Sequence, residues 1–266
     1  VGADTAGVIL AESPDSDDAM SLIVDVGTNA EIVLGDKDRL LVCSSPTGPA
    51  FEGGEISAGQ RATAGAIERV RIDRETLEPK FRVIGSELWS TEVGFQDSTK
   101  ELNITGICGS GIIEVVAEMF LAGIISEDGI VDGGLAKRSS RVRSHGRTWS
   151  YVLHFAEDET QRDIVVTQND VRQIQLAKAA LYAGIKLLMD KMGVSAVDRI
   201  RLAGAFGSHI SVEHAMVLGL IPDCALDHVS SAGNAAGVGA RIALLDHKAR
   251  DAIQQTVNRA ERIETA

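Results

Sequence analysis

The chain has 266 residues, of which 44% are hydrophobic and 24% charged, an ordinary composition for a globular protein. Its formal net charge of −12 argues against nucleic acid or an anionic membrane as a partner, and no apolar run reaches the length of a membrane span. The three cysteines lie far apart, which argues against a disulfide framework or a cluster motif in these residues and favours a reducing cytoplasm.

The first third of the chain is predicted to hold a short helix and then a meander of strands. Residues 4–11 are typical of the end of a helix, and an acidic surface loop follows. Apolar runs separated by short turns predict three antiparallel strands. These strands are expected at residues 21–26, 30–35 and 39–45. Gly53 and Gly54 are expected to open a helix that reaches residue 62.

The middle of the chain is predicted to contain a hairpin, a glycine-initiated helix and a loop. The hairpin is expected from strands at 66–72 and 80–85. Gly109 to Gly111 open a helix with Gly123 as its C-cap. Its apolar side is expected to hold Ile112, Ile113, Val116 and Phe120, and the opposite side Glu114 and Glu118. Residues 132–148 have few apolar side chains and are expected to form a loop.

The last part alternates strands with helices. The longest helix is expected at about 170–192, with Asn169 or Asp170 as its cap, because apolar residues recur there three and four apart. The other elements are strands at 149–155, 163–167 and 199–203, a short helix capped by Ser211, a Gly- and Ala-rich helix at 231–245 and a polar helix from about 248. Strands followed by alternating helices and strands predict an α/β fold, a mixed sheet with helices on its faces.

The most informative motif lies at the first turn between strands. Asp25 ends an apolar strand, and Gly27, Thr28 and Asn29 follow it in a tight turn. Gly27 would let backbone N–H groups approach an anion, and Asp25 could hold Mg²⁺ through water. The same residues are also typical of an ordinary β-hairpin, which needs Gly and Asn in its turn. The motif alone leaves both interpretations open.

Further glycine turns occur at other predicted strand ends. They are Gly53-Gly54, Gly109 to Gly111 and Gly204 to Gly207. Helix N-termini carry free N–H groups and a partial positive charge, so several of them together would form an anion site. The chain has no G-x-x-x-x-G-K-[ST] loop and no G-x-G-x-x-G after a strand, so a nucleotide would have to bind in a different framework.

The order of these motifs resembles the second half of the acetate and sugar kinase, heat-shock and actin (ASKHA) ATPases, in which two ribonuclease-H-like lobes clamp ATP. Four segments narrow the resemblance to the reductive activators of corrinoid-dependent methyltransferases. They are Asp-Val-Gly-Thr-Asn-Ala-Glu-Ile-Val-Leu-Gly at 25–35, Gly-Pro-Ala-Phe-Glu-Gly-Gly-Glu-Ile-Ser-Ala-Gly at 48–59, Gly-Ile-Cys-Gly-Ser-Gly-Ile-Ile-Glu at 106–114 and Gln-Leu-Ala-Lys-Ala-Ala at 175–180. Members of that family carry an N-terminal [2Fe–2S] domain and use ATP to return a Co(II) corrinoid to Co(I).

The resemblance implies a set of nucleotide-binding residues and assigns no catalytic residue. Residues 25–29 are similar to the second phosphate motif, 204–207 to the adenosine motif, and 4–11 and 233–245 to the two connecting helices at the hinge. Gln175 and Lys178 would contact the ribose, or would simply lie on a solvated helix face. The full set is Asp25, Gly27, Thr28, Asn29, Gly53, Gly54, Glu55, Gly109, Ser110, Gly111, Gln175, Lys178, Gly204 and Ala205, with Mg²⁺ held by Asp25 through water.

The resemblance also implies how the chain is divided and what it lacks. Residues 1–20 would be a connecting helix and acidic linker from a first lobe, 21–245 the second lobe with a hairpin insertion near 66–100, and 246–266 a C-terminal helix. The four-cysteine motif and a second Asp-x-Gly-Thr loop are absent from these residues. We therefore expect the chain alone to bind ATP weakly or not at all, and to be inactive.

The expected partner is the corrinoid protein of a methyltransferase system, and a homodimer is possible. Two other functions stay open at this point. One is a non-catalytic binding module for nucleotide or protein, and the other is a small-molecule kinase of the same superfamily.

Overall fold

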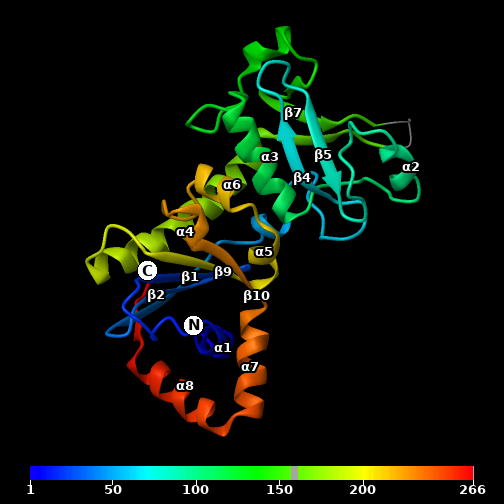
Figure 1. Ribbon diagram of the computed structural model, residues 1–266. Coiled ribbons are helices and arrows are strands. Elements are labelled where there is room, and N and C mark those ends of the chain that lie inside the picture. The colour runs from blue at the N-terminus through cyan, green and yellow to red at the C-terminus, as the bar shows by residue number, and fades with distance from the viewer. Residues whose placement is uncertain (157–160, 266) are drawn as a thin grey trace. The chain divides into compact units, whose positions relative to one another are not determined.

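The computed structural model describes residues 1–156 and 161–265, without the side chains of residues 205 and 206. The chain forms two compact units, shown in Figure 1. Unit 1 consists of Val1–Gly48 and Lys178–Ala266, and unit 2 of Pro49–Ala177. No helix in the described part of the chain is long and apolar enough to cross a membrane.

Unit 1 is built on a six-stranded mixed sheet. Its strand order is β10-β9-β1-β2-β3-β11. The strands are β1 (Ser21–Val26), β2 (Ala30–Gly35), β3 (Leu40–Ser45), β9 (Arg199–Ala203), β10 (Val229–Gly233) and β11 (Glu261–Arg262). β1 pairs antiparallel with β2 and parallel with β9, and β2 pairs antiparallel with β3. The predicted meander and the predicted mixed sheet are confirmed.

Helices cover both faces of this sheet. On one face, α1 (Ala3–Glu12), α7 (Ala235–Leu245) and α8 (His247–Arg259) contribute to one apolar core with Ile23, Val33 and Val42. On the other face lies the second half of α4 (Gln168–Met192), where the Ser45 hydroxyl donates to the Ala180 carbonyl at 2.6 Å. α5 (Gly204–His209), α6 (Val212–Val217) and the 3₁₀ turn η3 (Leu226–His228) connect β9 to β10. The Ser211 hydroxyl caps α6, as predicted.

Helices α1 and α7 cross in very close contact. A Cβ placed on Gly239 would lie 1.9 Å from the Gly7 carbonyl oxygen, and one on Gly7 would lie 2.8 Å from that of Ala236. The small residues of the Gly- and Ala-rich helix permit this close contact with α1. The predicted start of the helix at residue 231 is wrong, because residues 231–233 pair with β9 as the end of β10 and Asn234 caps α7.

Unit 2 contains two smaller sheets. β4 (Ile67–Ile72) and β5 (Pro79–Val83) form the predicted hairpin. β6 (Val142–His145), β7 (Thr148–His154) and β8 (Ile164–Thr167) form an antiparallel sheet of three strands. The helices of this unit are α2 (Phe95–Thr99), α3 (Gly109–Leu121) and the first half of α4, with 3₁₀ turns η1 (Ala50–Glu52) and η2 (Gly133–Lys137). The loop predicted at 132–148 is wrong in part, because it contains η2 and β6.

Helix α3 is oriented differently from the prediction. Glu114 is fully buried and Glu118 is 9% exposed, whereas Phe120 is 37% exposed. The reason is the free edge of β4, whose N–H groups at Val70 and Ile72 donate to the carboxylates of Glu114 and Glu118 at 2.9 Å. Two glutamates thus take the place of a neighbouring strand and protect the edge from other pairing.

The start of α4 also differs from the prediction in its cap. The Thr167 hydroxyl accepts from the Asp170 N–H, and the Asp170 carboxylate accepts from the Thr167 N–H at 2.7 Å. This reciprocal arrangement is a capping box, so Thr167 is the cap and Asp170 completes it. Asp170 also accepts from the Ser57 N–H at 2.7 Å, which ties the helix start to the loop after η1.

Candidate functional site

The ends of β1 and β9 bring Asp25 and Gly204 together from distant parts of the chain. Asp25 pairs with Ala203 in the parallel register, and Gly204 is the next residue. Gly204 has φ +82°, and a Cβ there would lie 2.5 Å from the Asp25 Oδ1 atom. Only glycine tolerates both the positive φ and this close approach. The two predicted motifs therefore form one local structure at the carboxyl ends of parallel strands, where ligands bind in open α/β sheets.

The turn between β1 and β2 is held by the residues that follow β3. The Thr47 hydroxyl donates to the Gly27 carbonyl at 2.9 Å, and the Gly48 N–H donates to the Thr28 carbonyl at 2.9 Å. Thr28 and Asn29 are exposed. The turn is thus a fixed hairpin that presents short polar side chains to solvent. The hairpin interpretation is confirmed, and the role of the same turn as a phosphate loop stays a prediction.

Carboxylates are concentrated beside this turn. Asp25 lies directly opposite Glu31 in the β1–β2 register. The Glu31 Oε2 atom is buried, with no hydrogen-bond partner in the described structure. Burial raises the pKa of Asp25, and the nearby carboxylates of Glu31 and Asp4 raise it further. Like charges directly opposite one another in a sheet are destabilising, so a bound cation would reduce the repulsion between Asp25 and Glu31.

The donor set fits a magnesium ion that keeps most of its water. No group of three or more His, Cys, Asp or Glu side chains in the described residues could hold a metal ion by itself. Mg²⁺ usually binds through one or two carboxylates together with waters and substrate phosphates. Asp25 is the carboxylate at the turn that would take this part, and its role at a metal ion stays a prediction.

The residues predicted to contact the ribose lie on α4. The Gln175 side chain donates to the Asp128 carbonyl at 2.9 Å, so it has a structural partner inside unit 2. The Lys178 ammonium lies in unit 1, where a Cβ placed on Gly219 would be 3.3 Å from its Nζ atom. Ala205 belongs to α5 by its backbone, but its side chain lies outside the described residues. Their role at a nucleotide stays a prediction.

The helix predicted to begin at Gly53 and Gly54 is wrong. The 3₁₀ turn η1 ends before Gly53, and the N–H groups of Gly53 and Gly54 donate to the carbonyls of Ala50 and Pro49. Those N–H groups are therefore already used inside the turn. Glu55 is exposed with φ +63°. A turn of this kind requires glycines for its own geometry, because a Cβ on Gly54 would lie 2.6 Å from the Pro49 Cβ atom.

The helix predicted to open at Gly109 is confirmed as α3, with Cys108 as its N-cap. The Ser110 hydroxyl donates to the Glu68 carbonyl at 3.3 Å. A Cβ on Gly111 would lie 2.3 Å from the Ile67 carbonyl oxygen. Close packing against β4 thus explains why position 111 is a glycine. Whether this N-terminus also meets a phosphate stays a prediction.

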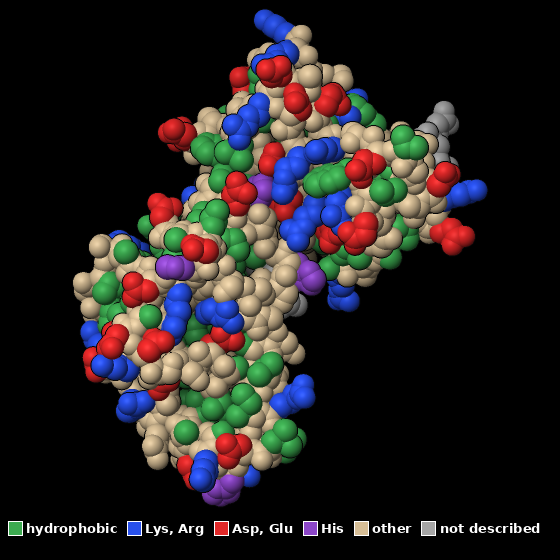
Figure 2. All heavy atoms as spheres, in the orientation of Figure 1, with side chains coloured by type: hydrophobic (Ala, Val, Ile, Leu, Met, Phe, Trp, Pro, Cys, Tyr) green, Lys and Arg blue, Asp and Glu red, His purple; other side chains and the backbone are tan. Residues whose placement is uncertain are grey.

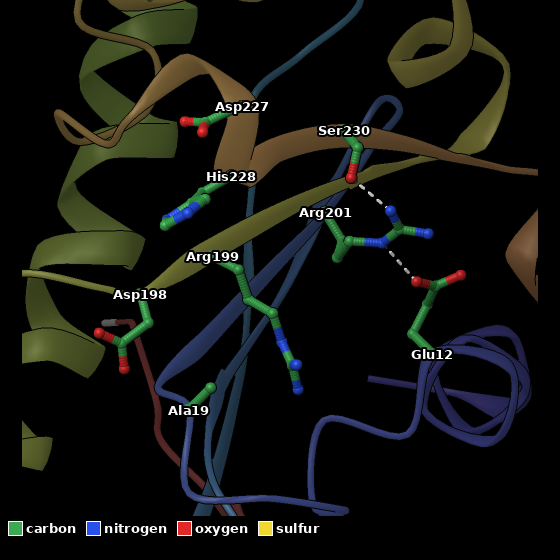
Figure 3. Close-up of a pocket in the computed structure, with 8 residues that line it drawn as sticks. All are labelled: Glu12, Ala19, Asp198, Arg199, Arg201, Asp227, His228 and Ser230. Atoms are coloured by element: carbon green, nitrogen blue, oxygen red, sulfur yellow. Dashed lines mark hydrogen bonds and ion pairs between the residues drawn. The ribbon is translucent and has the colours of Figure 1, made fainter.

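A pocket of about 580 Å³ lies at the opposite, amino ends of the parallel strands (Figure 3). Arg199 pairs there with Asp17 at 2.9 Å, and Arg201 pairs with Glu12 at 2.5 Å. Figure 3 shows Arg201 held between Glu12 and Ser230. Because both guanidinium groups are already paired, this pocket is a poor anion site, and the carboxyl ends of the strands stay the better candidate.

Sequence reasoning missed two residues of the candidate site. Glu31 is the one residue of β2 that is not fully buried, and its position opposite Asp25 could have been found from the register of the hairpin. Thr47 lies beyond the predicted meander, and no local pattern indicates that its hydroxyl holds the Gly27 turn.

Comparison with known proteins identifies the family. Residues 19–266 match the model of the C-terminal domain of RACo, the ASKHA domain. A reductive activator for corrinoid, iron-sulfur protein is a structural neighbour with a TM-score of 0.84 and 35% identity, covering 99% of this chain and 40% of the neighbour. The predicted fold, a ribonuclease-H-like α/β fold of the actin and heat-shock type with helices on the faces of a mixed sheet, is therefore confirmed.

Two characterised relatives are similar over nearly the whole chain. One is the corrinoid activation enzyme RamQ of Eubacterium limosum, 36% identical over 253 residues, which are 92% of this chain and 40% of the relative. The other is a [Co(II) methylated amine-specific corrinoid protein] reductase of Methanosarcina barkeri, 25% identical over 263 residues, with 96% and 44% covered. The chain thus spans about two fifths of the length of its relatives. It belongs to the family of RACo C-terminal ASKHA domains.

Proposed function

We propose that the natural protein that carries this chain uses MgATP to drive the reduction of a Co(II) corrinoid protein to Co(I), and that unit 1 supplies half of its ATP site. The observation that carries the proposal is the contact between the Asp25 carboxylate and Gly204 at the ends of β1 and β9. Under this proposal the contact would join a phosphate-binding turn to an adenosine-binding turn. The names of the relatives, which act on corrinoid proteins, support the reaction.

The candidate nucleotide-binding residues of unit 1 would each contact a different part of MgATP. Thr28 and Asn29 present short polar side chains at the turn and would donate to phosphate oxygens. Asp25 would orient a water of the magnesium ion, which would neutralise phosphate charge when bound. The backbone of Gly204 would lie against the flat face of a base, while the Asp25 carboxylate occupies the side on which a Cβ would point. Lys178 would reach the nucleoside from α4.

The cysteines of the described residues do not fit an iron–sulfur cluster. Cys43 and Cys108 are buried, and their thiols donate to the backbone carbonyls of Gly184 and Ile67. Burial raises the pKa of Cys43 to about 12, which keeps it a thiol and not a metal-binding thiolate. The [2Fe–2S] domain would therefore belong to another part of the natural protein.

The chain would contribute a conformational change and not a redox group. A ligand shifts an equilibrium only by its different affinity for two states, so ATP has to bind one arrangement of the protein better than another. The glycine-mediated contact between α1 and α7 is a suitable hinge, because these helices meet backbone against backbone without long side chains between them. Under this proposal the protein closes around ATP, and this closed state makes the unfavourable electron transfer to the Co(II) corrinoid possible.

Titration of a fluorescent ATP analogue into the natural protein tests the nucleotide site. We expect Asp25→Ala and Gly204→Val to abolish binding, and the isolated chain to bind weakly or not at all. The Gly204 variant would fail because the new side chain meets Asp25 Oδ1. Micromolar affinity in the isolated chain, or full affinity in either variant, would contradict the assignment. No ATP binding by the natural protein at all would favour a non-catalytic binding module.

A further inference from the structure

The β4–β5 hairpin of unit 2 carries four cations on one face. Its register places Arg69 opposite Arg82 and Arg71 opposite Lys80. The other face of the hairpin holds the buried apolar side chains of Val70, Ile72, Phe81 and Val83. We call the four cations together with Trp89 the cationic face. Figure 2 shows Lys and Arg side chains gathered over this part of unit 2.

The cross-strand pairing of one cation with another does not itself stabilise the hairpin. Like charges directly opposite one another in a sheet are destabilising. The carboxylates that offset them lie below or beside the face. Glu114, fully buried, accepts from Arg69 at 2.8 Å and from Arg71 at 2.6 Å, and Glu87 pairs with Arg82. Glu118 also lies 4.0 Å from Arg71. Because Glu114 and Glu118 are buried, the outward surface presents the guanidinium groups of Arg69 and Arg71, whereas Arg82 is paired with the exposed Glu87.

Lys80 and Trp89 are the residues of the cationic face that a partner could contact most directly. Lys80 is exposed and makes no ion pair within the described residues. Its ammonium lies 5.1 Å from the centre of the Trp89 ring, and the Arg71 guanidinium lies 5.9 Å from it. Trp89 is half-buried. Tryptophan and arginine are the residue types that most often dominate the energy of a protein interface.

We propose that the cationic face is a docking surface for an acidic surface of the corrinoid protein. This inference rests on the proposed function, which requires a protein partner. A chain with a net charge of −12 repels an acidic partner over most of its surface, so a local cationic face would steer that partner to one orientation. The same net charge disfavours nucleic acid as the occupant.

Lys80→Glu in the natural protein tests the face without disturbing the fold. The new carboxylate would lie opposite Arg71, so the change replaces a repulsive pair by an attractive one. The matched control is Lys248→Glu, the same charge change at the exposed start of α8 in unit 1. The probe is the purified corrinoid protein of the same organism, and its affinity is measured at low and high salt beside the affinity for an ATP analogue.

We expect Lys80→Glu to bind the corrinoid protein about tenfold more weakly at low salt, with the difference disappearing at high salt. The affinity of Lys80→Glu for the ATP analogue should stay unchanged. Lys248→Glu should bind both the corrinoid protein and the ATP analogue as the unaltered protein does. Trp89→Ala should weaken docking at both salt concentrations. Unchanged docking by Lys80→Glu would overturn the docking face alone. No docking by the unaltered protein would overturn the proposed function as well, and a Lys80-dependent affinity for duplex DNA in its place would make the face a nucleic-acid site.

Discussion

Glu114 provides the sharpest test of how unit 2 is held together. Its buried carboxylate accepts from Arg69, Arg71 and the Val70 N–H. Glu114→Ala leaves the buried Val70 N–H without an acceptor, which costs about 1–3 kcal/mol. The two arginine side chains, 32% and 39% exposed, can turn to solvent, so losing their pairs adds only about 1 kcal/mol. We expect a total loss of about 3 kcal/mol. Glu114→Gln keeps an acceptor for Val70 and should cost about 1 kcal/mol.

The two tryptophans make this loss measurable. Trp89 and Trp149 are the only tryptophans in the sequence, and both belong to unit 2, so their fluorescence reports the unfolding of that unit in urea. With an m-value of about 2 kcal/mol/M, Glu114→Ala should lower the midpoint by about 1.5 M. Glu101→Ala, at an exposed position of the same unit, is the control and should leave it unchanged. A Glu114→Ala midpoint equal to that of the control would refute the account of the β4 edge.

Three further predictions concern unit 1. Asp25→Asn should stabilise the nucleotide-free protein by up to about 1 kcal/mol at pH 7. Because folding raises the pKa of Asp25, its ionised form costs stability above that pKa, and the cost vanishes as the pH falls toward 3.8. Gly239→Ala places a Cβ 1.9 Å from the Gly7 carbonyl oxygen and should destabilise by about 1–3 kcal/mol, measured by thermal unfolding. At pH 8 the half-exposed Cys224 should react with a disulfide reagent while Cys43, whose pKa burial raises to about 12, does not.

Each of these has a control and a contradicting outcome. The gain from Asp25→Asn should shrink when unfolding is repeated near pH 4, and a loss of stability at pH 7 would show that the carboxylate is not strained by Glu31. For Gly239→Ala the control is Gly2→Ala, where an added Cβ meets nothing within 4 Å. Equal melting temperatures for the two would contradict the close helix contact. Equal reaction rates of Cys43 and Cys224 would contradict the burial of Cys43.

The β1–β2–β3 meander and its candidate site could be predicted because the information is local. Each strand is an apolar run that ends in a turn, and Asp25, Thr28 and Asn29 are polar residues at the first of these turns. The contact between Asp25 and Gly204 could be expected only from the resemblance to a known family. Residues separated by a long stretch of chain meet there through the parallel pairing of β1 and β9, which no local pattern indicates.

The failures came from interactions outside the pattern of each segment. Helical periodicity placed Glu114 on the side opposite the apolar residues of α3, but the carboxylate accepts from the unpaired edge of β4 and is buried there. Gly53 and Gly54 resemble a helix start, yet their N–H groups are used within a turn. The residues at 231–233 have the composition of the helix that follows, but β9 pairs with them as a strand. In each case tertiary hydrogen bonding overrode local propensity.

The central claim is that Asp25 helps an ATP-driven protein reduce a Co(II) corrinoid. The most direct measurement follows the visible absorption of the corrinoid protein as the natural protein, supplied with MgATP and a low-potential electron donor, converts Co(II) to Co(I). We predict that Asp25→Asn still docks the corrinoid protein but no longer accelerates the reduction when ATP is added. An unchanged ATP-dependent rate in this variant would contradict the account.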